Sequence, residues 1–131
     1  INTDANKDAI IITMSTITKI LSLSKEDFYR KHLLIINHIL PVQMSTKQAE
    51  VLAAFISLEG ELSEHRFSTL GRKLIMDKLG LDPGGLGNYL RFFKDNNYII
   101  KNPSSKKLEI IPILIPNNKI QTYQFKLIAN D

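Results

Sequence analysis

Positively charged side chains gather in one stretch of the sequence, and the chemistry they offer is attraction to a polyanion. Residues 66–107 hold nine lysines and arginines against three aspartates, which is a net charge of +6. Residues 1–65 have a net charge of −2, and residues 108–131 have none. Charge concentrated in one part of a chain is typical of proteins that bind nucleic acid. The alternative is a solvated surface on which basic residues cluster by chance.

Residue types that carry catalysis or bind metals are present without the spacing that such chemistry needs. The chain has three histidines, His32, His38 and His65, and their spacing is not that of zinc ligands. The turn at 80–84 lacks the lysine and serine of a phosphate-binding loop. No serine lies in a recognisable nucleophile turn. We therefore expect a protein that is not an enzyme and uses no cofactor, metal or small-molecule ligand.

The composition is that of a folded chain rather than a disordered one. Of the 131 residues, 44% are hydrophobic and 23% are charged. The absence of cysteine excludes disulfides and fits a reducing compartment. No apolar run approaches the ~20 residues of a membrane-spanning helix, and residues 9–14 are too short for a signal peptide. We expect a cytoplasmic protein with no membrane partner.

The first part of the chain is expected to form an arm, a short strand and a helix. Residues 1–16 show weak periodicity and read as an arm. Alternation over residues 17–23 predicts a strand. Ser24 can cap a helix that Pro41 ends. One face of this helix carries the set Phe28, His32, Ile35, Ile36 and Ile39. This face can pack against the core or form a dimer interface.

Two further helices follow, separated by a polar connection at 61–66. Ser45 and Gln48 stand at the positions of a capping box, which predicts a helix over 45–58. The next helix is expected over 68–79, with Gly80 as its left-handed C-terminal cap. Its predicted apolar stripe is Leu70, Leu74, Ile75 and Leu79.

A fourth helix is predicted over 82–97. Asp82 is suited to the N-cap and Pro83 to the first helical position. The tight turn at 79–83 sets this helix at a steep angle to the preceding one. Steps of 100° place Leu86, Tyr89, Leu90 and Phe93 inward. They place Gly84, Gly87, Asn88, Arg91 and Asp95 outward, with Lys94 at the border.

After residue 97 the period changes from 3.6 to 2. Strands are expected over 98–102 and 107–111, joined by a turn, and alternation over 123–127 predicts a last strand. The predicted fold class is α+β and mainly helical. We expect an N-terminal extension over 1–44, and a domain over 45–131 that includes the extra C-terminal strand.

Residues 45–116 resemble the winged helix-turn-helix domains of bacterial and phage regulators. The stretch that carries the resemblance is RKLIMDKLGLDPGGLGNYLRFFKDNNYIIKN, residues 72–102. It is similar to the family's order of a support helix, a Leu-Gly-Leu turn, a recognition helix, and a strand that enters the wing. The order and spacing are characteristic of the family, although no single residue is diagnostic.

The resemblance implies DNA contacts from the support helix, the recognition helix and the wing. The implied residues are Ser68, Thr69, Arg72, Lys73, Gly84, Gly85, Gly87, Asn88, Arg91, Lys94, Lys101, Lys106 and Lys107. Asn88 can pair with adenine or can be an ordinary exposed polar residue. Arg91 can contact guanine or phosphate.

Three glycines in the predicted recognition helix depart from the family's pattern. Each costs a helix up to ~1 kcal/mol relative to alanine. One account is a close approach of the backbone to DNA, with free N–H groups at the helix start meeting a phosphate. The other is an irregular first turn. Few side chains then remain to read bases.

These patterns lead to one main hypothesis and one alternative. The main hypothesis is a protein that binds double-stranded DNA in transcription control or replication, in the cytoplasm of a bacterium or of a phage's host cell. The alternative is a winged-helix module for protein interaction or assembly, without nucleic-acid contact. Regulators of this fold commonly act as dimers, so the resemblance also implies a homodimer.

Overall fold

The structure is a computed structural model that describes residues 8–13 and 15–130. The described part is α+β, and its helices are α1 (Lys25–Ile36), α2 (Thr46–Ile56), α3 (Glu61–Glu64), α4 (Thr69–Leu79) and α5 (Pro83–Asp95). Short 3-10 helices, η2 (Asn37–Ile39) and η3 (Pro112–Leu114), follow α1 and β4. The strands are β1 (Ala9–Ile12), β2 (Ile17–Ile20), β3 (Ile99–Lys101) and β4 (Leu108–Ile110).

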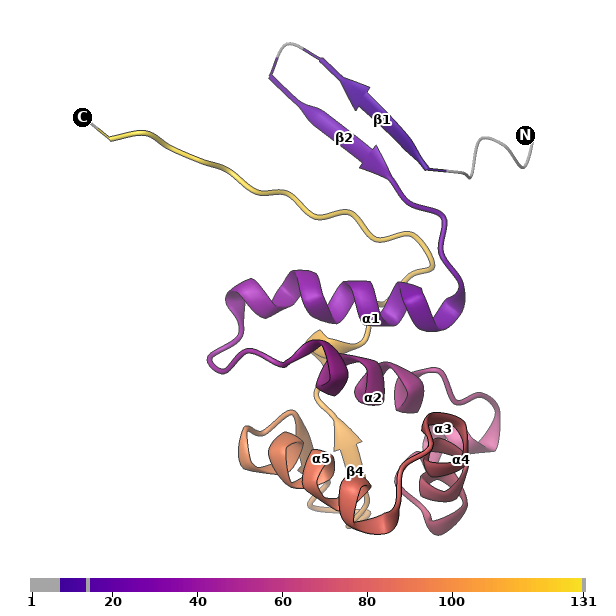
Figure 1. The fold of residues 1–131 in the computed structure, drawn as a ribbon. Helices are drawn as coiled ribbons and strands as arrows, with labels where there is room; N and C mark the ends of the chain where they lie inside the picture. Colours follow the sequence, from indigo (N-terminus) through magenta and orange to yellow (C-terminus); the bar gives the residue numbers. More distant parts are fainter. Residues whose placement is uncertain (1–7, 14, 131) are drawn as a thin grey trace.

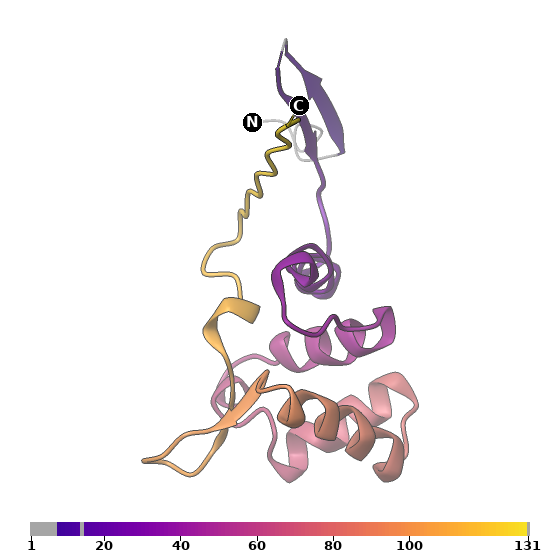
Figure 2. The ribbon, with the colours of Figure 1, turned by 90° about the vertical axis from the view of Figure 1, so that its left-hand side faces the viewer.

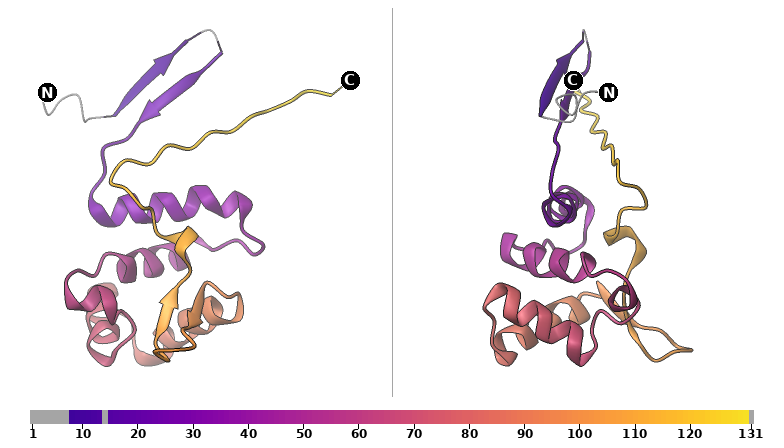
Figure 3. Two further views of the ribbon diagram at one scale, coloured as in Figure 1. Left: turned by 180° about the vertical axis from the view of Figure 1, so that it is seen from behind. Right: turned by 90° about the vertical axis from the view of Figure 1, so that its right-hand side faces the viewer.

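The helices form successive levels, with α1 above α2 and with α3, α4 and α5 below it (Figure 1). The strands pair antiparallel as two separate two-stranded sheets. The β1–β2 ribbon stands on the far side of α1, whereas the β3–β4 hairpin projects sideways from the lower level (Figure 2). Residues 117–130, called the tail below, bend over 117–120 and then run past α1 as an extended chain (Figure 3). The two hairpins therefore lie at opposite ends of the molecule.

The helix α1 begins where its cap residue predicts, because the Ser24 hydroxyl accepts the N–H of Asp27. Its apolar face packs on the core, where Leu33 and Ile36 are buried beside α2. The α1 face therefore serves the core rather than a dimer interface. Ile39 was expected on that face, but it is 68% exposed, because the chain tightens into η2 and turns it outward. Asn37 is buried in η2 instead, and its side chain bonds both the N–H and the carbonyl of Met44.

The helix α2 is the centre of the core. Its predicted capping box is present, with reciprocal bonds between Ser45 and Gln48. The helix ends at Ile56, two residues before the predicted end. Every residue from Val51 to Ile56 is buried, so other elements cover this helix on all sides. The position of each neighbouring helix is consequently defined by how it packs on α2.

The predicted stripe of α4 is wrong in two of its four positions. Leu70 and Leu74 are 56% and 38% exposed, while Gly71 and Ile75 are buried. A Cβ at position 71 would overlap the backbone carbonyl of Arg66. The helix therefore turns its glycine toward the preceding segment, which rotates Leu70 and Leu74 toward solvent. The predicted polar connection before it holds the one-turn helix α3.

The strands differ from the prediction at both ends of the chain. The β3–β4 hairpin is confirmed with shorter strands. The extension 1–44 holds two strands rather than one, since β1 forms in the segment expected to be an arm. Residues 1–7 of that arm lie outside the described residues. The expected last strand over 123–127 is absent, because the tail has no neighbouring strand to pair with.

A buried histidine holds the tail against α1. Nε2 of His32 lies 3.2 Å from the backbone oxygen of Ile113. A carbonyl only accepts, so Nε2 carries the proton and Nδ1 accepts the hydroxyl of Tyr123. Burial lowers the pKa of His32 below its ordinary value of 6.5, and the bond to Ile113 opposes this only in part. The neutral imidazole is therefore the form that fits the folded protein.

The contact at Gly71 predicts a large loss of stability in Gly71→Ala. The added methyl group must displace backbone rather than a flexible side chain, which we expect to cost about 2–3 kcal/mol of unfolding free energy. Urea unfolding followed by circular dichroism measures this. The matched control is Gly87→Ala, because a Cβ at position 87 meets nothing within 4 Å. Equal stability of the Gly71 variant and the wild type would contradict this packing.

The burial of His32 predicts a stability that depends on pH. The unfolded chain binds a proton near its ordinary pKa, whereas the folded chain does so only at lower pH. The contribution of His32 is therefore complete above about pH 6.5 and declines as the pH falls toward the folded pKa. We expect His32→Gln to lose less stability than the wild type between about pH 7.5 and pH 5.5. An equal loss of unfolding free energy between the two pH values in both proteins would exclude this role.

Candidate nucleic-acid interface

The predicted recognition helix is α5, and its two faces are divided as the sequence predicts. Leu86, Leu90 and Phe93 are buried and Tyr89 is half-buried. The outward set is exposed, and it consists of Gly84, Gly87, Asn88, Arg91, Lys94 and Asp95. The separation is clear because the apolar residues recur at helical spacing over the whole length of the helix.

A tight turn joins α4 to α5. Gly80 adopts the left-handed conformation at φ 66°, and its N–H bonds the carbonyl of Met76. The N–H of Leu81 bonds the same carbonyl. Asp82 then caps α5, with Pro83 as the first helical residue. Because Gly80 and Leu81 are bonded to α4 and the next residue, Asp82, already caps α5, the turn fixes the direction of α5 relative to α4.

The start of α5 is less suited to a phosphate than the sequence suggested. The carboxylate of Asp82 accepts the N–H of Gly85 at 2.6 Å, so this N–H is not free. Pro83 has no N–H, and the carboxylate itself repels an anion. The start of α4 differs, because its cap is the neutral Ser68 and its first turn holds no acidic residue. The helix geometry leaves the N–H of Thr69 without an intrahelical partner, which favours a phosphate there.

A hollow of about 220 Å³ lies between α4 and α5. Its lining is Thr69, Arg72, Met76, Pro83, Leu86, Gly87 and Leu90. The Nε atom of Arg72 is buried in this region without a hydrogen-bond partner among the described residues. The helix surface at Gly87 is open, since a Cβ there would touch nothing. The structure thus brings three predicted contact residues, Thr69, Arg72 and Gly87, to one depression.

The tip of the β3–β4 hairpin is organised by one side chain. The Oδ1 atom of Asn102 accepts the N–H groups of Ser104 and Ser105 at 2.8 and 3.1 Å. Lys106 follows with φ 66°, a backbone conformation that residues other than glycine rarely adopt. Lys106 and Lys107 are both exposed. Asn102 was not among the predicted site residues, although an asparagine two residues before a serine pair is a recognised turn signal.

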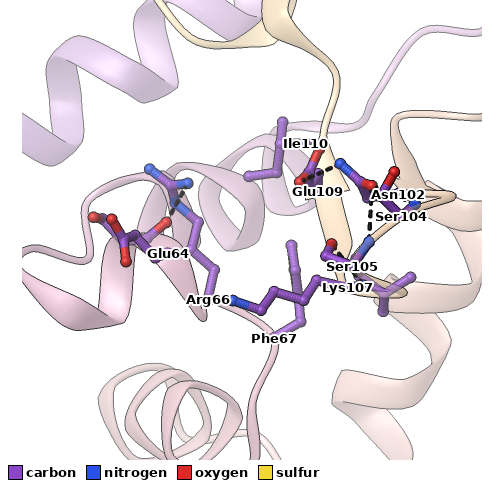
Figure 4. Close-up of a pocket in the computed structure, with 11 residues that line it drawn as sticks. Glu64, Arg66, Phe67, Asn102, Ser104, Ser105, Lys107, Glu109 and Ile110 are labelled. Carbon is purple, nitrogen blue, oxygen red and sulfur yellow. Dashed lines mark hydrogen bonds between the residues drawn. The ribbon is translucent and has the colours of Figure 1, made fainter.

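A second hollow, of about 480 Å³, places this hairpin beside the segment that leads into α4 (Figure 4). It is lined on one side by residues that include Arg66 and Phe67, and on the other by residues that include Ser105 and Lys107. The segment that leads into α4 and the first residue of that helix thus line the two hollows, the second through Arg66 and Phe67 and the first through Thr69. Lys73 and Lys101 are exposed but line neither hollow.

The side chain of Arg66 is hydrogen-bonded to the protein's own backbone. Its Nε donates to the carbonyl of Phe55 at 3.1 Å and its Nη1 to that of Ser63 at 2.8 Å. Burial lowers the pKa of its guanidinium, although a positive charge is retained at neutral pH. These bonds attach the turn before α4 to α2, so Arg66 positions the site more than it presents charge.

Four basic residues outside the predicted set form ion pairs, whereas others outside it, such as Lys31 and Lys126, form none within the described residues. Lys25, Arg30, Lys47 and Lys78 bond to Glu59, Asp27, Glu50 and Glu26. Within residues 8–13 and 15–130, no ion pair joins an acidic group to any of Arg72, Lys73, Arg91, Lys94, Lys101, Lys106 and Lys107. The charge of this set is therefore not neutralised by the protein's own carboxylates.

The described part of the chain holds no cluster of three or more potential metal ligands. Over the same residues, no helix combines the length and the apolar character needed to cross a bilayer. Comparison of the chain with protein-family models finds no match, and comparisons with curated proteins and with solved structures find none either.

Proposed function

We propose that residues 45–116 form a winged helix-turn-helix domain that binds double-stranded DNA without catalysing a reaction. In this proposal α5 is the recognition helix, which enters the major groove, and the β3–β4 hairpin is the wing. The observation that carries the proposal is the set of basic side chains on α4, α5 and the hairpin that lack internal counterions. Such charges are matched by DNA phosphates, with release of the counterions that those phosphates hold.

Two positions on this surface carry residues that their local conformation disfavours. Gly87 lies inside a helix, where alanine is better by up to ~1 kcal/mol and would fit without a clash. Lys106 lies in a left-handed conformation that glycine adopts more easily. Residues that reduce stability without a packing reason point to a role outside the fold itself. A close approach of DNA to Gly87 and a phosphate contact at Lys106 explain both.

The contacts divide by element. The start of α4, with Ser68, Thr69 and Arg72, holds a phosphate between the hairpin and α5. On α5, Asn88 reads a base edge while Arg91 and Lys94 contact the DNA backbone. The remaining basic residues of the hairpin and α4 add charge along the flanking phosphates, and they are Lys73, Lys101, Lys106 and Lys107. We propose that this occupancy serves transcription control or replication in the cytoplasm.

One observation favours the alternative of a protein-interaction module. Leu70 and Leu74 lie one turn apart on α4 and are both exposed. Paired leucines on a helix surface can receive an apolar partner. The DNA titrations below separate the alternatives, because a module that acts through Leu70 and Leu74 without nucleic-acid contact leaves a labelled duplex unbound.

The uncompensated charges predict duplex binding that weakens steeply with salt. The triple variant Arg91→Ala, Lys106→Ala, Lys107→Ala is expected to lose about 100-fold in affinity at about 0.1 M salt. Its log–log salt slope should also be smaller by about 2–3. Fluorescence anisotropy with a labelled duplex at several salt concentrations measures both quantities.

The matched control for this triple variant removes the same charge elsewhere. Lys25→Ala, Lys47→Ala, Lys78→Ala changes three exposed lysines outside the predicted set. We expect it to bind the duplex within about threefold of the wild type, since only nonspecific long-range attraction is lost. Equal losses in the two triple variants, or no binding by the wild type, would refute the interface.

The two disfavoured positions predict opposite changes in stability and affinity. Gly87→Ala and Lys106→Gly should each raise unfolding free energy by about 0.5–1 kcal/mol, through better helix propensity and relief of strain. Both should weaken duplex binding, Gly87→Ala by obstructing close approach and Lys106→Gly by removing a charge. Thermal unfolding and anisotropy on the same samples measure the pair of effects.

Asn97→Gly is the control for this comparison, because Asn97 is also left-handed, at φ 60°, but lies beyond the C-terminal end of α5. It should bind DNA like the wild type. If Gly87→Ala gained stability and kept full affinity, the close approach of DNA to α5 would be wrong.

A further inference from the structure

The β1–β2 ribbon is apolar on both of its faces. Its register pairs Ile12 with Ile17 and Ile10 with Lys19, and these residues share one face. The other face holds Ile11 with Thr18 and Ala9 with Ile20. A strand that carries isoleucine on both faces is typical of sheets covered on both sides.

The described residues of one chain leave this ribbon uncovered. All five of its isoleucines are exposed, and they are Ile10, Ile11, Ile12, Ile17 and Ile20. The ribbon stands away from the helices, beyond α1 (Figure 1). Its outer strand edges also carry backbone groups without a neighbouring strand. A two-stranded ribbon is marginally stable by itself in water, so it requires a cover.

The tail also has exposed apolar side chains, and it lacks a neighbouring strand among the described residues. It bends over 117–120 and has no helix or strand over 121–130, and the backbone hydrogen bonds within the described residues include none from this segment. Its apolar side chains Ile120, Phe125, Leu127 and Ile128 are exposed, with Leu127 at 98%. The ribbon thus has free strand edges and uncovered isoleucines, while the tail is a strand-like segment without a sheet.

The tail of the same chain does not pair with this ribbon within the described residues. Tyr123 bonds His32 in the middle of α1, and the ring of Phe125 packs edge-on against His38 beyond the C-terminal end of α1. The ribbon joins α1 at the opposite end, through Ser24. From Tyr123 onward the tail therefore leaves the root of its own ribbon and runs on the same side of α1 as the ribbon, without a backbone hydrogen bond to it within the described residues (Figures 1 and 2).

We propose that a second copy of this chain covers the ribbon, with the tail of each copy lying along the β1–β2 ribbon of the other. Added strands complete backbone hydrogen bonds at a sheet edge while alternate side chains bury on its faces. A second copy is the occupant that the chain itself supplies, because each copy brings one ribbon and one tail in equal number. A twofold arrangement uses all four segments and closes on itself.

This inference does not depend on DNA binding. The ribbon and the tail lie above α1, whereas α4, α5 and the β3–β4 hairpin lie below α2 (Figure 3). A dimer joined through the upper segments leaves both lower surfaces free. The two proposals can therefore fail separately.

Sedimentation velocity of the full chain over a concentration series tests the assembly. We expect the wild type to sediment at twice the mass of one chain, and Ile17→Lys and Leu127→Lys at the mass of one chain. Ile17 and Leu127 are 75% and 98% exposed within one copy, so these changes leave its own packing intact. The control Ile113→Lys alters an isoleucine that is 51% exposed outside both segments, and it should remain dimeric. A monomeric wild type throughout the series would overturn the proposal.

Disulfide trapping identifies which segments meet, since the chain has no cysteine. An equimolar mixture of Ile17→Cys and Leu127→Cys proteins should give a cross-linked pair under mild oxidation, whereas Ile17→Cys mixed with Ile113→Cys should give little. The double variant Ile17→Cys, Leu127→Cys should also cross-link between copies. A cross-link confined to single chains of the double variant would mean that the tail covers its own ribbon, and would overturn the exchange.

Discussion

The helix α4 passes so close to the carbonyl of Arg66 that only glycine fits at position 71. This contact sets the direction of α4, and the side chain of Arg66 attaches the same turn to α2. The tight turn at Gly80 then passes that direction on to α5. The orientation of α5, and with it the position of the hollow beside it, therefore depends on the contact between Gly71 and Arg66.

Local sequence signals predicted the helices well because their causes are local. Ser24, Ser45, Ser68 and Asp82 each accept the backbone N–H expected of a cap, and α1, α2, α4 and α5 begin after them. The stripe of α5 was also predictable, because its apolar residues recur at helical spacing over the whole length of the helix. In α4 the leucines formed the more hydrophobic pattern, and the sequence contains no sign that Gly71 meets another backbone.

The strands and the site show where local signals end. Alternation in the tail marks residues able to join a sheet, but it does not supply the neighbouring strand. The strand β1 was not predicted, because its consecutive isoleucines lack the alternation of a half-buried strand. The exposed residues of the site followed from helical spacing. The bond between Asp82 and Gly85, and the buried Nε of Arg72, depend on three-dimensional packing that spacing does not encode.

Glycines at positions 84, 85 and 87 leave a bare strip of main chain along the first turns of α5. Main-chain atoms are the same for every residue type, so such a strip carries little information about base identity. On the proposed function, discrimination between duplexes beyond the contact of Asn88 then falls to their mechanical properties. Stiff A-tracts and easily kinked pyrimidine–purine steps differ in groove width and in the energy needed to deform them. A helix that lies close to the groove floor would sense those differences.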